Sequence, residues 1–221
     1  MAEPNSGVEK IASVRAGGEK AYKEGTVKVF IGFPENLKNR FNVSVFGKFP
    51  NDSILWRILK LSRKCGVVSI LADLDFPLHC TVLEGLWEGS EEDRISLFER
   101  MSDEVGTLLN YSSPFISLTF TDLVLDGGGN LLLMSDVIPE RVLQLRSNLA
   151  NLYNANGLKV LPLDNMLHST LQRVKEFSDP MKYFGSGVLW LHPINPFVGG
   201  IDFLTLNYYV GPALDLLLRQ P

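Results

Sequence analysis

Cysteine and histidine are scarce in this chain, and long apolar runs are missing. Its 221 residues include two cysteines and three histidines. Cys65 and Cys80 are too few for a disulfide framework, which predicts a reducing compartment. The apolar stretch from Phe115 to Leu125 is interrupted by Ser, Thr and Asp, so no segment reaches the ~20 apolar residues of a membrane span. Because the first residues also lack the pattern of a signal peptide, we expect a cytoplasmic protein without a membrane partner.

An excess of positive charge is missing as well. The net charge is −4, which excludes a general basic field for binding long nucleic acid. A local basic pocket for a small nucleotide-like substrate remains compatible with this charge. Hydrophobic residues make up 45% and charged residues 21% of the chain, which is typical of a soluble globular protein. We expect a monomer.

The order of apolar patterns predicts an α+β fold. Residues 1–25 are polar and glycine-rich, so we expect a flexible N-terminal tail, with at most one short helix, followed by a single bilobed domain over residues 26–221. Each half of that domain has a helix leading to a strand with a histidine near its start. We therefore expect a duplicated, two-lobed arrangement in which antiparallel sheets form a central cleft and helices lie on the outside.

The expected elements follow from apolar periodicity and from capping and turn residues. The helices are expected over residues 52–65, 90–110 and 139–156, with a helical turn at 179–184. The strands are expected over residues 26–33, 67–71, 78–83, 114–125, 131–134, 167–174 and 197–210, with a strand or loop at 41–49.

A glycine-rich segment, Asp126–Asn130, lies between two of these expected strands. Glycine-rich loops can cradle phosphate, but they do so where a strand runs into a helix. A plain β-hairpin loop is therefore the favoured interpretation.

Two of the three histidines occur in near-identical settings, LHCTV at residues 78–82 and LHSTL at residues 167–171. Alternate residues of a strand share a face, so each histidine points the same way as the threonine two places on. The intervening residues are apolar or small and suit packing under helices. The candidate catalytic residues are therefore His79, Thr81, His168 and Thr170.

Such a set suits the opening of a cyclic phosphate. The reaction needs a base to deprotonate water and an acid to protonate the leaving oxygen, and histidine serves both roles with its ordinary pKa of ~6.5. Each threonine hydroxyl can donate to a non-bridging phosphoryl oxygen, where negative charge accumulates. This chemistry requires neither a metal ion nor a cofactor. Which histidine is the base stays open.

The two His-x-Thr motifs resemble those of the 2H phosphoesterase superfamily, and most closely its branch of RNA 2′,3′-cyclic phosphodiesterases and 2′-5′ RNA ligases. That branch commonly has an arginine five places after the second histidine, which Arg173 supplies. The odd offset requires a β-bulge, or a rim position, to bring Arg173 into the cleft. Glu84 departs from the aromatic-glycine segment that the branch has after its first motif. The resemblance implies the two-lobed fold and an RNA-type substrate.

Several other residues are candidates for substrate contact. Arg173 and Lys28 are the basic residues expected near a phosphate. Aromatic side chains on strands, or at their ends, can stack a base, although each one singly is more often part of the core. The aromatic candidates are Phe33, Trp87, Tyr208 and Tyr209.

Four further residues favour structural interpretations. His192 has no threonine two places on and is followed by proline, which indicates a loop. Asp73 and Asp75 lack a matching cluster of metal ligands and are interpreted as turn acids. Cys80 lies on the face opposite His79 and is expected to be a small core residue rather than a nucleophile.

The sequence therefore predicts a metal-independent phosphoesterase acting on a 2′,3′-cyclic phosphate or a 2′-5′ phosphodiester of RNA or nucleotides. Three alternatives stay open. The same residues could bind a nucleotide or RNA end without turnover, could join RNA ends, or could act on a phosphoester that is not RNA.

Overall fold

The computed structural model describes residues 7–32, 39–47, 59–60, 62–72, 75, 78–110, 116–184, 197–201 and 203–206. Its helices are α1 (Gly7–Glu24), α3 (Glu91–Asn110), α4 (Glu140–Ala155) and α5 (Pro180–Phe184). Its strands are β1 (Arg40–Gly47), β2 (Val67–Leu71), β3 (Leu78–Leu86), β4 (Ile116–Phe120), β5 (Asp122–Leu125), β6 (Asn130–Ser135), β7 (Lys159–Val160), β8 (Leu167–Phe177), β9 (Phe197–Ile201) and β10 (Phe203–Leu206).

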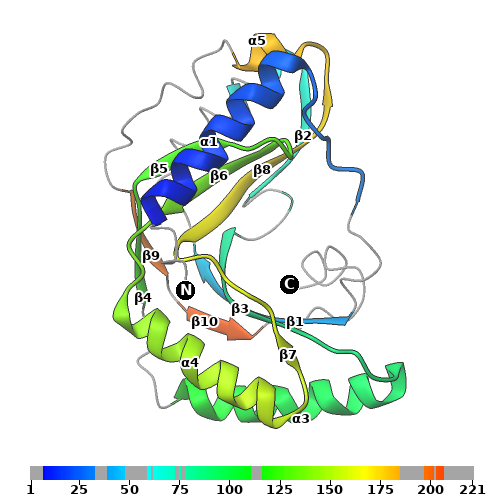
Figure 1. Cartoon of the computed structure of the whole chain (residues 1–221), viewed down its shortest axis with the longest axis vertical. Coiled ribbons are helices and arrows are strands. Elements are labelled where there is room, and N and C mark those ends of the chain that lie inside the picture. Colours follow the sequence, from blue (N-terminus) through cyan, green and yellow to red (C-terminus); the bar gives the residue numbers. More distant parts are fainter. Residues whose placement is uncertain are drawn as a thin grey trace.

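Eight strands form one open sheet, in the order β10-β1-β3-β8-β6-β5 (Figure 1). Two short strands lie off this path, because β2 pairs with β8 and β7 pairs with β3. Strands β4 and β9 form a separate two-stranded sheet. Every described pairing is antiparallel, so the expected α+β class with antiparallel strands is confirmed.

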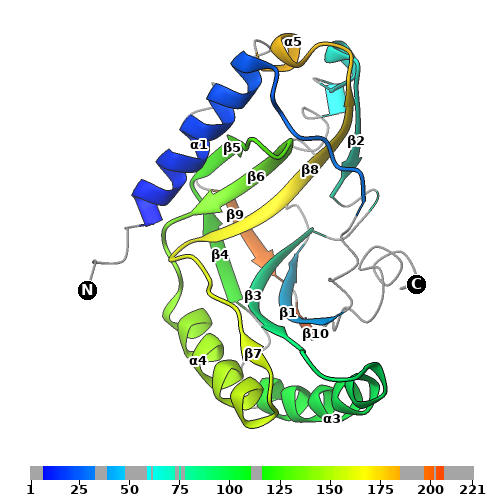
Figure 2. The same ribbon diagram turned by 45° about the vertical axis from the view of Figure 1, so that its right-hand side comes forward.

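The two motif-bearing strands, β3 and β8, are neighbours at the centre of this sheet. The strand that precedes each of them in the chain crosses over to the other: β2 leads into β3 but pairs with β8, and β7 leads into β8 but pairs with β3. The two motif strands therefore meet over a short stretch and diverge on either side of it (Figure 2). Both motifs belong to one continuous sheet.

Helices cover different faces of this sheet. Val142 and Leu149 of α4 join the large apolar core with Leu123 and Leu133, which lie on one face of β5 and β6. Figure 2 shows α3 and α4 at one end of the molecule and α1 along β5 at the other.

The opposite face of β5 and β6 is covered by α1. Ile11 of α1 packs in a second, smaller cluster with Val124, Leu132 and Met134. Gly18 is also required here, because a Cβ would lie 1.9 Å from the carbonyl oxygen of Leu125. His168 is the Cα partner of Met134 and lies on the same face, nearer the centre of the sheet. The helix α1 therefore covers the outer part of the face that carries His168.

The expectation of a flexible N-terminal tail is wrong for Gly7–Glu24. These residues form a helix of 18 residues whose Tyr22 is fully buried against Phe177 and Tyr183. Arg15 also pairs with Asp122 of β5. The polar composition hid a narrow apolar stripe that is sufficient to pack a helix against a sheet.

Three expected strands differ from the structure. The single strand expected over 114–125 is divided into β4 and β5, which belong to different sheets. Residues 26–32 form no strand, although the backbone N–H of Phe30 donates to the carbonyl of Val174 at 2.8 Å. The single long strand expected over 197–210 is divided into β9 and β10, which belong to different sheets.

The remaining element predictions agree with the described residues. The helix at 91–110 begins after Ser90, whose Oγ accepts from the backbone N–H of Asp93 at 3.1 Å. The hairpin is confirmed as β5–β6, so the glycine-rich segment between them is a turn. No helix among the described residues is long and apolar enough to cross a membrane.

Candidate active site on the paired motif strands

The two His-x-Thr motifs meet where β3 pairs with β8. The Cα partners there are Cys80 and Ser169, the middle residues of the two motifs. In an antiparallel pair, directly opposite residues point to the same face, and their immediate neighbours point to the other face. The histidine and threonine of both motifs therefore lie together on one face of the sheet, on the face opposite Cys80 and Ser169.

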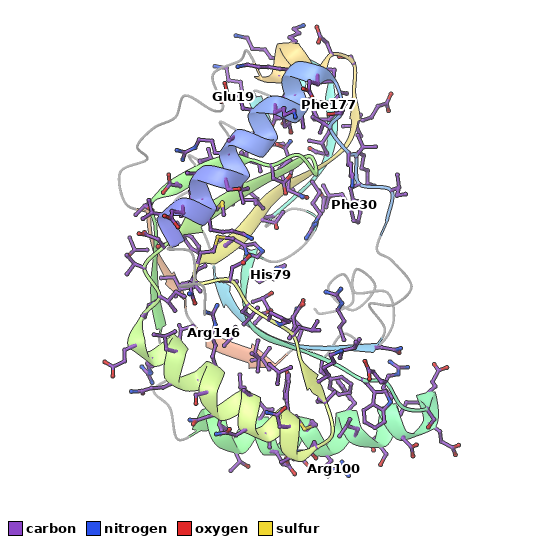
Figure 3. All side chains as sticks on the ribbon, viewed as in Figure 1. Glu19, Phe30, His79, Arg100, Arg146 and Phe177 are labelled. Carbon is purple, nitrogen blue, oxygen red and sulfur yellow. The ribbon has the colours of Figure 1, made fainter. Side chains whose placement is uncertain are left out.

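The register also fixes how the four residues alternate. One step along each strand from Cys80 and Ser169, His79 lies across from Thr170 and Thr81 lies across from His168. The two histidines are then diagonal neighbours, with an expected separation of about 7–8 Å. Figure 3 shows His79 at the centre of the molecule, where the two motif strands meet.

Exposure distinguishes the two faces, as the sequence pattern predicts. Cys80 is 3% exposed and Ser169 is 2% exposed, so the middle residues lie in the core. His168 is exposed, and His79 and Thr81 are half-buried. Thr170 is 6% exposed. The histidine-bearing face is therefore accessible to a ligand at three of its four motif positions.

The middle residues hold the two strands together. Ser169 Oγ donates to the carbonyl oxygen of His79 at 2.6 Å, so one motif is tied directly to the backbone of the other. Burial raises the pKa of the Cys80 thiol to about 12, although Arg146 and the backbone of His168 oppose this effect. A thiol with this pKa is a poor nucleophile, which agrees with a packing role for Cys80.

A β-bulge follows each motif at the same offset. Along β1 and β3, the register runs from Ser44 opposite Thr81 to Val43 opposite Leu83, so Val82 is the extra residue. Along β6 and β8, the register passes from Thr170 to Gln172 against consecutive β6 residues, so Leu171 is the extra residue. Each extra residue is the third after its histidine. The two motif strands therefore share a backbone irregularity as well as a sequence pattern.

The bulge places Arg173 on the same face as His168. Without it, the odd offset of five residues would point the two side chains to opposite faces. With it, Arg173 pairs with Asn130 and Thr170 pairs with Leu132, two positions apart on β6 and therefore on one face. The bulge required by the sequence analysis is present, and Glu84 occupies the corresponding position after the first motif.

Arg173 is held from two sides. Its Nη1 donates to Asn130 Oδ1 at 3.3 Å. Its Cζ lies 5.7 Å from the centroid of the Phe30 ring, within the range of a cation–π interaction. Lys28, the other basic candidate, has an exposed side chain, and its backbone N–H donates to the carbonyl of Gly127.

Glu84 is paired differently. Its Oε2 lies 3.1 Å from Arg40 Nη1, and both side chains are partly exposed. The two strands thus carry opposite charges at matched positions, Glu84 on β3 and Arg173 on β8. An anion on this face is attracted to Arg173, whereas Arg40 compensates the charge of Glu84.

The surroundings of His168 favour its neutral form. Desolvation lowers the pKa of the His168 ring, and the charge of Arg173 lowers it further. Asp164 and Asp126 raise this pKa, and Arg146 lowers it. Because the residue is exposed, solvent moderates all of these effects.

Trp87 is the aromatic candidate that the structure describes, and it does not lie beside the histidines. Trp87 follows β3 at a distance of roughly 25 Å along the strand from His79, and its indole N–H donates to the carbonyl of Ser90 at 2.8 Å. This bond ties Trp87 to the residue that precedes α3. Phe33, Tyr208 and Tyr209 lie outside the described residues.

The acidic candidates behave as expected where they are described. Asp75 Oδ2 accepts from the backbone N–H of Leu71 at 2.7 Å, which is a turn interaction. Asp73 and His192 lie outside the described residues. Within the part of the chain that the structure describes, no group of three or more His, Cys, Asp or Glu side chains could hold a metal ion.

Sequence reasoning missed two residues of this site, Asn130 and Phe30. Asn130 was visible only as part of a glycine-rich turn, and Phe30 only as part of an expected strand. Asn130 becomes recognisable once the bulge after Thr170 fixes the register of β8 against β6. Phe30 becomes recognisable through its backbone hydrogen bond to Val174 of β8.

No protein-family model matches the chain, and no curated protein matches it significantly.

Proposed function

We propose that this chain is a two-histidine phosphoesterase that acts on a 2′,3′-cyclic phosphate or a 2′-5′ phosphodiester of RNA or nucleotides. His79 and His168 serve as acid and base, and Thr81 and Thr170 donate hydrogen bonds to the phosphoryl oxygens. Arg173 attracts the anionic substrate. The proposed chemistry needs no metal ion, and we expect the enzyme to work in the cytoplasm.

The observation that carries this proposal is the pairing of Cys80 with Ser169. It supports a shared site, because both motifs then lie on one face of adjacent strands, with both imidazoles and the Thr81 hydroxyl accessible to a ligand. Two unrelated core histidines have no reason to meet in this way. The exposure of His168 supports the same interpretation, because a purely structural histidine at the centre of a sheet would be covered.

The reaction divides between the two imidazoles. In hydrolysis of a cyclic phosphate, the neutral imidazole takes a proton from water as the water oxygen bonds to phosphorus. The protonated imidazole gives its proton to the ribose oxygen as the bond from phosphorus to that oxygen breaks. The threonine hydroxyls and Arg173 stabilise the charge that builds on the non-bridging oxygens. The reverse course joins ends, so ligation is a variant of the same chemistry.

We also propose that the domain is a duplicated, two-lobed structure. The support is the matched bulge after each motif and the exchange of β2 and β7 between the motif strands. A twofold relation between β3 and β8 accounts for both features at once. It also accounts for two acid-base groups of the same type on opposite sides of one substrate.

The test is turnover of a 2′,3′-cyclic nucleotide by the full chain and by His79→Ala and His168→Ala variants. Each substitution is expected to lower kcat by about a thousandfold or more, because it removes one proton-transfer group. His192→Ala is the matched control, since His192 carries no motif, and it should keep the wild-type rate. Full activity in either motif variant contradicts the proposal.

Calorimetry with a nucleoside monophosphate separates catalysis from simple binding. Tight binding of the nucleotide without any turnover favours a binding module over an enzyme. Parallel assays with a 2′-5′ dinucleotide, with RNA ends and with a cyclic sugar phosphate identify the substrate class. Turnover confined to the sugar phosphate would keep the two-histidine chemistry and remove RNA as the substrate.

A further inference from the structure

The glycine-rich turn between β5 and β6 ends beside Arg173. Asn130, the first residue of β6, is the Cα partner of Arg173 on β8. Its side-chain oxygen accepts from Arg173 Nη1 at 3.3 Å, so the end of the hairpin reaches the guanidinium directly. This hairpin turn therefore contacts a cation that can bind phosphate.

A second contact to Arg173 comes from a distant part of the chain. Phe30 lies in the segment between α1 and β1, and Figure 3 shows it on the side of the molecule above His79. The Arg173 Cζ lies 5.7 Å from the centroid of its ring. The guanidinium thus has a hydrogen-bond acceptor on one side and an aromatic ring on another.

Both contacting residues are themselves fixed. Asn130 Nδ2 donates to Asp126 Oδ2 at 2.9 Å, and the Asn130 backbone N–H donates to Asp126 Oδ1 at 2.8 Å. The Phe30 backbone N–H donates to the carbonyl of Val174 at 2.8 Å. Asn130 cannot move away from Arg173 without breaking its bonds to Asp126, and the Phe30 backbone is held beside β8. The long, rotamer-rich side chain of Arg173 thereby has two contacts that order it before a ligand arrives.

We infer that Asn130 and Phe30 are positioning residues, which hold the guanidinium of Arg173 on the face that carries both His-x-Thr motifs. Their role is to order a cation for the anionic group of the substrate. The inference rests on the proposed function for its purpose, but the geometry of the contacts stands without it. It also assigns a role to the Asp126–Asn130 turn, as the support of Asn130.

The competing explanation is that Asn130 only stabilises its hairpin. The chain offers a matched control for this explanation. Asn42 on β1 is the Cα partner of Glu84 on β3, as Asn130 on β6 is the partner of Arg173 on β8. Asn42 also accepts a side-chain hydrogen bond, from Ser44 at 3.2 Å. Its replacement therefore perturbs a comparable strand pair without touching Arg173.

The experiment uses the full chain with single substitutions Asn130→Ala, Phe30→Leu, Asn42→Ala and Arg173→Ala. The first readout is an NMR titration of His168, whose pKa responds to the charge of Arg173. The second readout is kcat and KM for a 2′,3′-cyclic nucleotide. Circular dichroism verifies that each variant is folded.

Both positioning variants are expected to raise the pKa of His168 toward its value in Arg173→Ala. They are also expected to raise KM by about three- to tenfold, the size of a weakened contact to a charged group, while kcat changes less. Asn42→Ala should leave the His168 pKa and KM unchanged.

One confounding effect must be separated. Asn130→Ala also frees Asp126, whose charge acts on His168 directly. Phe30→Leu leaves the hydrogen bonds between Asn130 and Asp126 in place and tests the contact of the ring with Arg173. In addition, Phe30→Leu made in an Arg173→Ala background should change neither readout further, because an effect that passes through Arg173 vanishes with it.

The inference is overturned if both variants leave the His168 pKa unchanged, or if Phe30→Leu is additive with Arg173→Ala. Should Asn130→Ala fail to fold, Phe30→Leu still decides the question. The titration needs no turnover, so it tests positioning even if the wild-type chain proves inactive. Absence of turnover in the wild type would count against the proposed function instead.

Discussion

The two motif strands, β3 and β8, are alike through the His-x-Thr motif and the bulge, and they differ in the side chains that follow the bulge. Each carries a histidine, a buried middle residue, a threonine and a bulge at the same offsets, and each is flanked by the strand that precedes its counterpart. The likeness ends immediately after the bulge. The fourth residue after the histidine is Leu83 on β3 and Gln172 on β8, and the fifth is Glu84 or Arg173.

The divergent residues serve different purposes on the two strands. Leu83 is 4% exposed and joins the apolar core, whereas Gln172 is fully buried and bonded to hydroxyl groups. Glu84 pairs with Arg40, whereas Arg173 contacts Asn130 and lowers the pKa of His168. The comparison indicates that the proposed acid-base groups come from the shared part of the strands, and that the difference in charge comes from the divergent part.

The largest expected effect is on stability, at the fourth residue after each histidine, which is Leu83 on β3 and Gln172 on β8. Gln172 Nε2 donates to Ser62 Oγ at 2.6 Å and to Ser69 Oγ at 2.9 Å, and its Oε1 accepts from Tyr183. Gln172→Leu makes this position like its β3 counterpart, but it removes a hydrogen bond from the buried hydroxyls of Ser62 and Tyr183 and from the half-buried hydroxyl of Ser69. The free energy of unfolding in urea should fall by about 3 kcal/mol.

Leu83→Met is the control for that substitution. It keeps the volume and polarity of the side chain, so it should cost less than about 1.5 kcal/mol. Equal losses from the two substitutions would show that the hydrogen-bonded network around Gln172 contributes nothing particular.

A smaller effect, on KM, is expected at the fifth residue after each histidine, which is Glu84 on β3 and Arg173 on β8. Arg173→Ala removes the cation that attracts the substrate, so KM should rise by about tenfold, the effect of losing one hydrogen bond to a charged group. Glu84→Gln removes a negative charge that is already compensated by Arg40, so KM should change by less than about threefold. Steady-state kinetics with a cyclic nucleotide measures both. A larger effect at Glu84 than at Arg173 would reverse the proposed polarity of the site.

The smallest effect is a pH dependence of stability. The pKa of His168 is lower in the folded chain than its ordinary value of ~6.5. As the pH falls below ~6.5, the unfolded state therefore takes up the proton first. The stability contributed by neutral His168 is present above that pH and is lost as the pH falls through the folded-state pKa.

Urea unfolding between pH 5 and pH 7 should therefore show a steeper loss of stability on acidification in the wild type than in His168→Ala. Parallel pH profiles for the two proteins would mean that the surroundings of His168 do not disfavour its charged form.

The sequence was sufficient for the parts of the site that depend on local pattern. Alternation in the motifs predicted that Cys80 and Ser169 are buried and that each histidine shares a face with its threonine, because these follow from strand geometry alone. The helix after Ser90 and the hairpin around the glycine-rich turn followed from capping and turn residues for the same reason.

Other features depended on contacts between distant segments and could not be predicted. Residues 197–210 read as one strand, because nothing local shows that β9 and β10 join different sheets. The helix α1 is stabilised by burial of Ile11 and Tyr22 against strands far along the chain, which its own polar composition does not reveal. The sequence predicted only that Arg173 needs a bulge or a rim position to reach the cleft. It could not locate the bulge at Leu171, because a bulge is defined by the register of two strands.

The most direct test of the two-histidine site is an NMR titration of the chain with a nucleoside 2′-monophosphate. The chain has three histidines, so each imidazole can be assigned by single substitution. A single phosphate held between the motifs should shift the ring signals of both His79 and His168 with one common Kd and leave His192 unchanged. If only one motif histidine responds, or if the two respond with different Kd values, the histidines do not share one phosphate and the account is wrong.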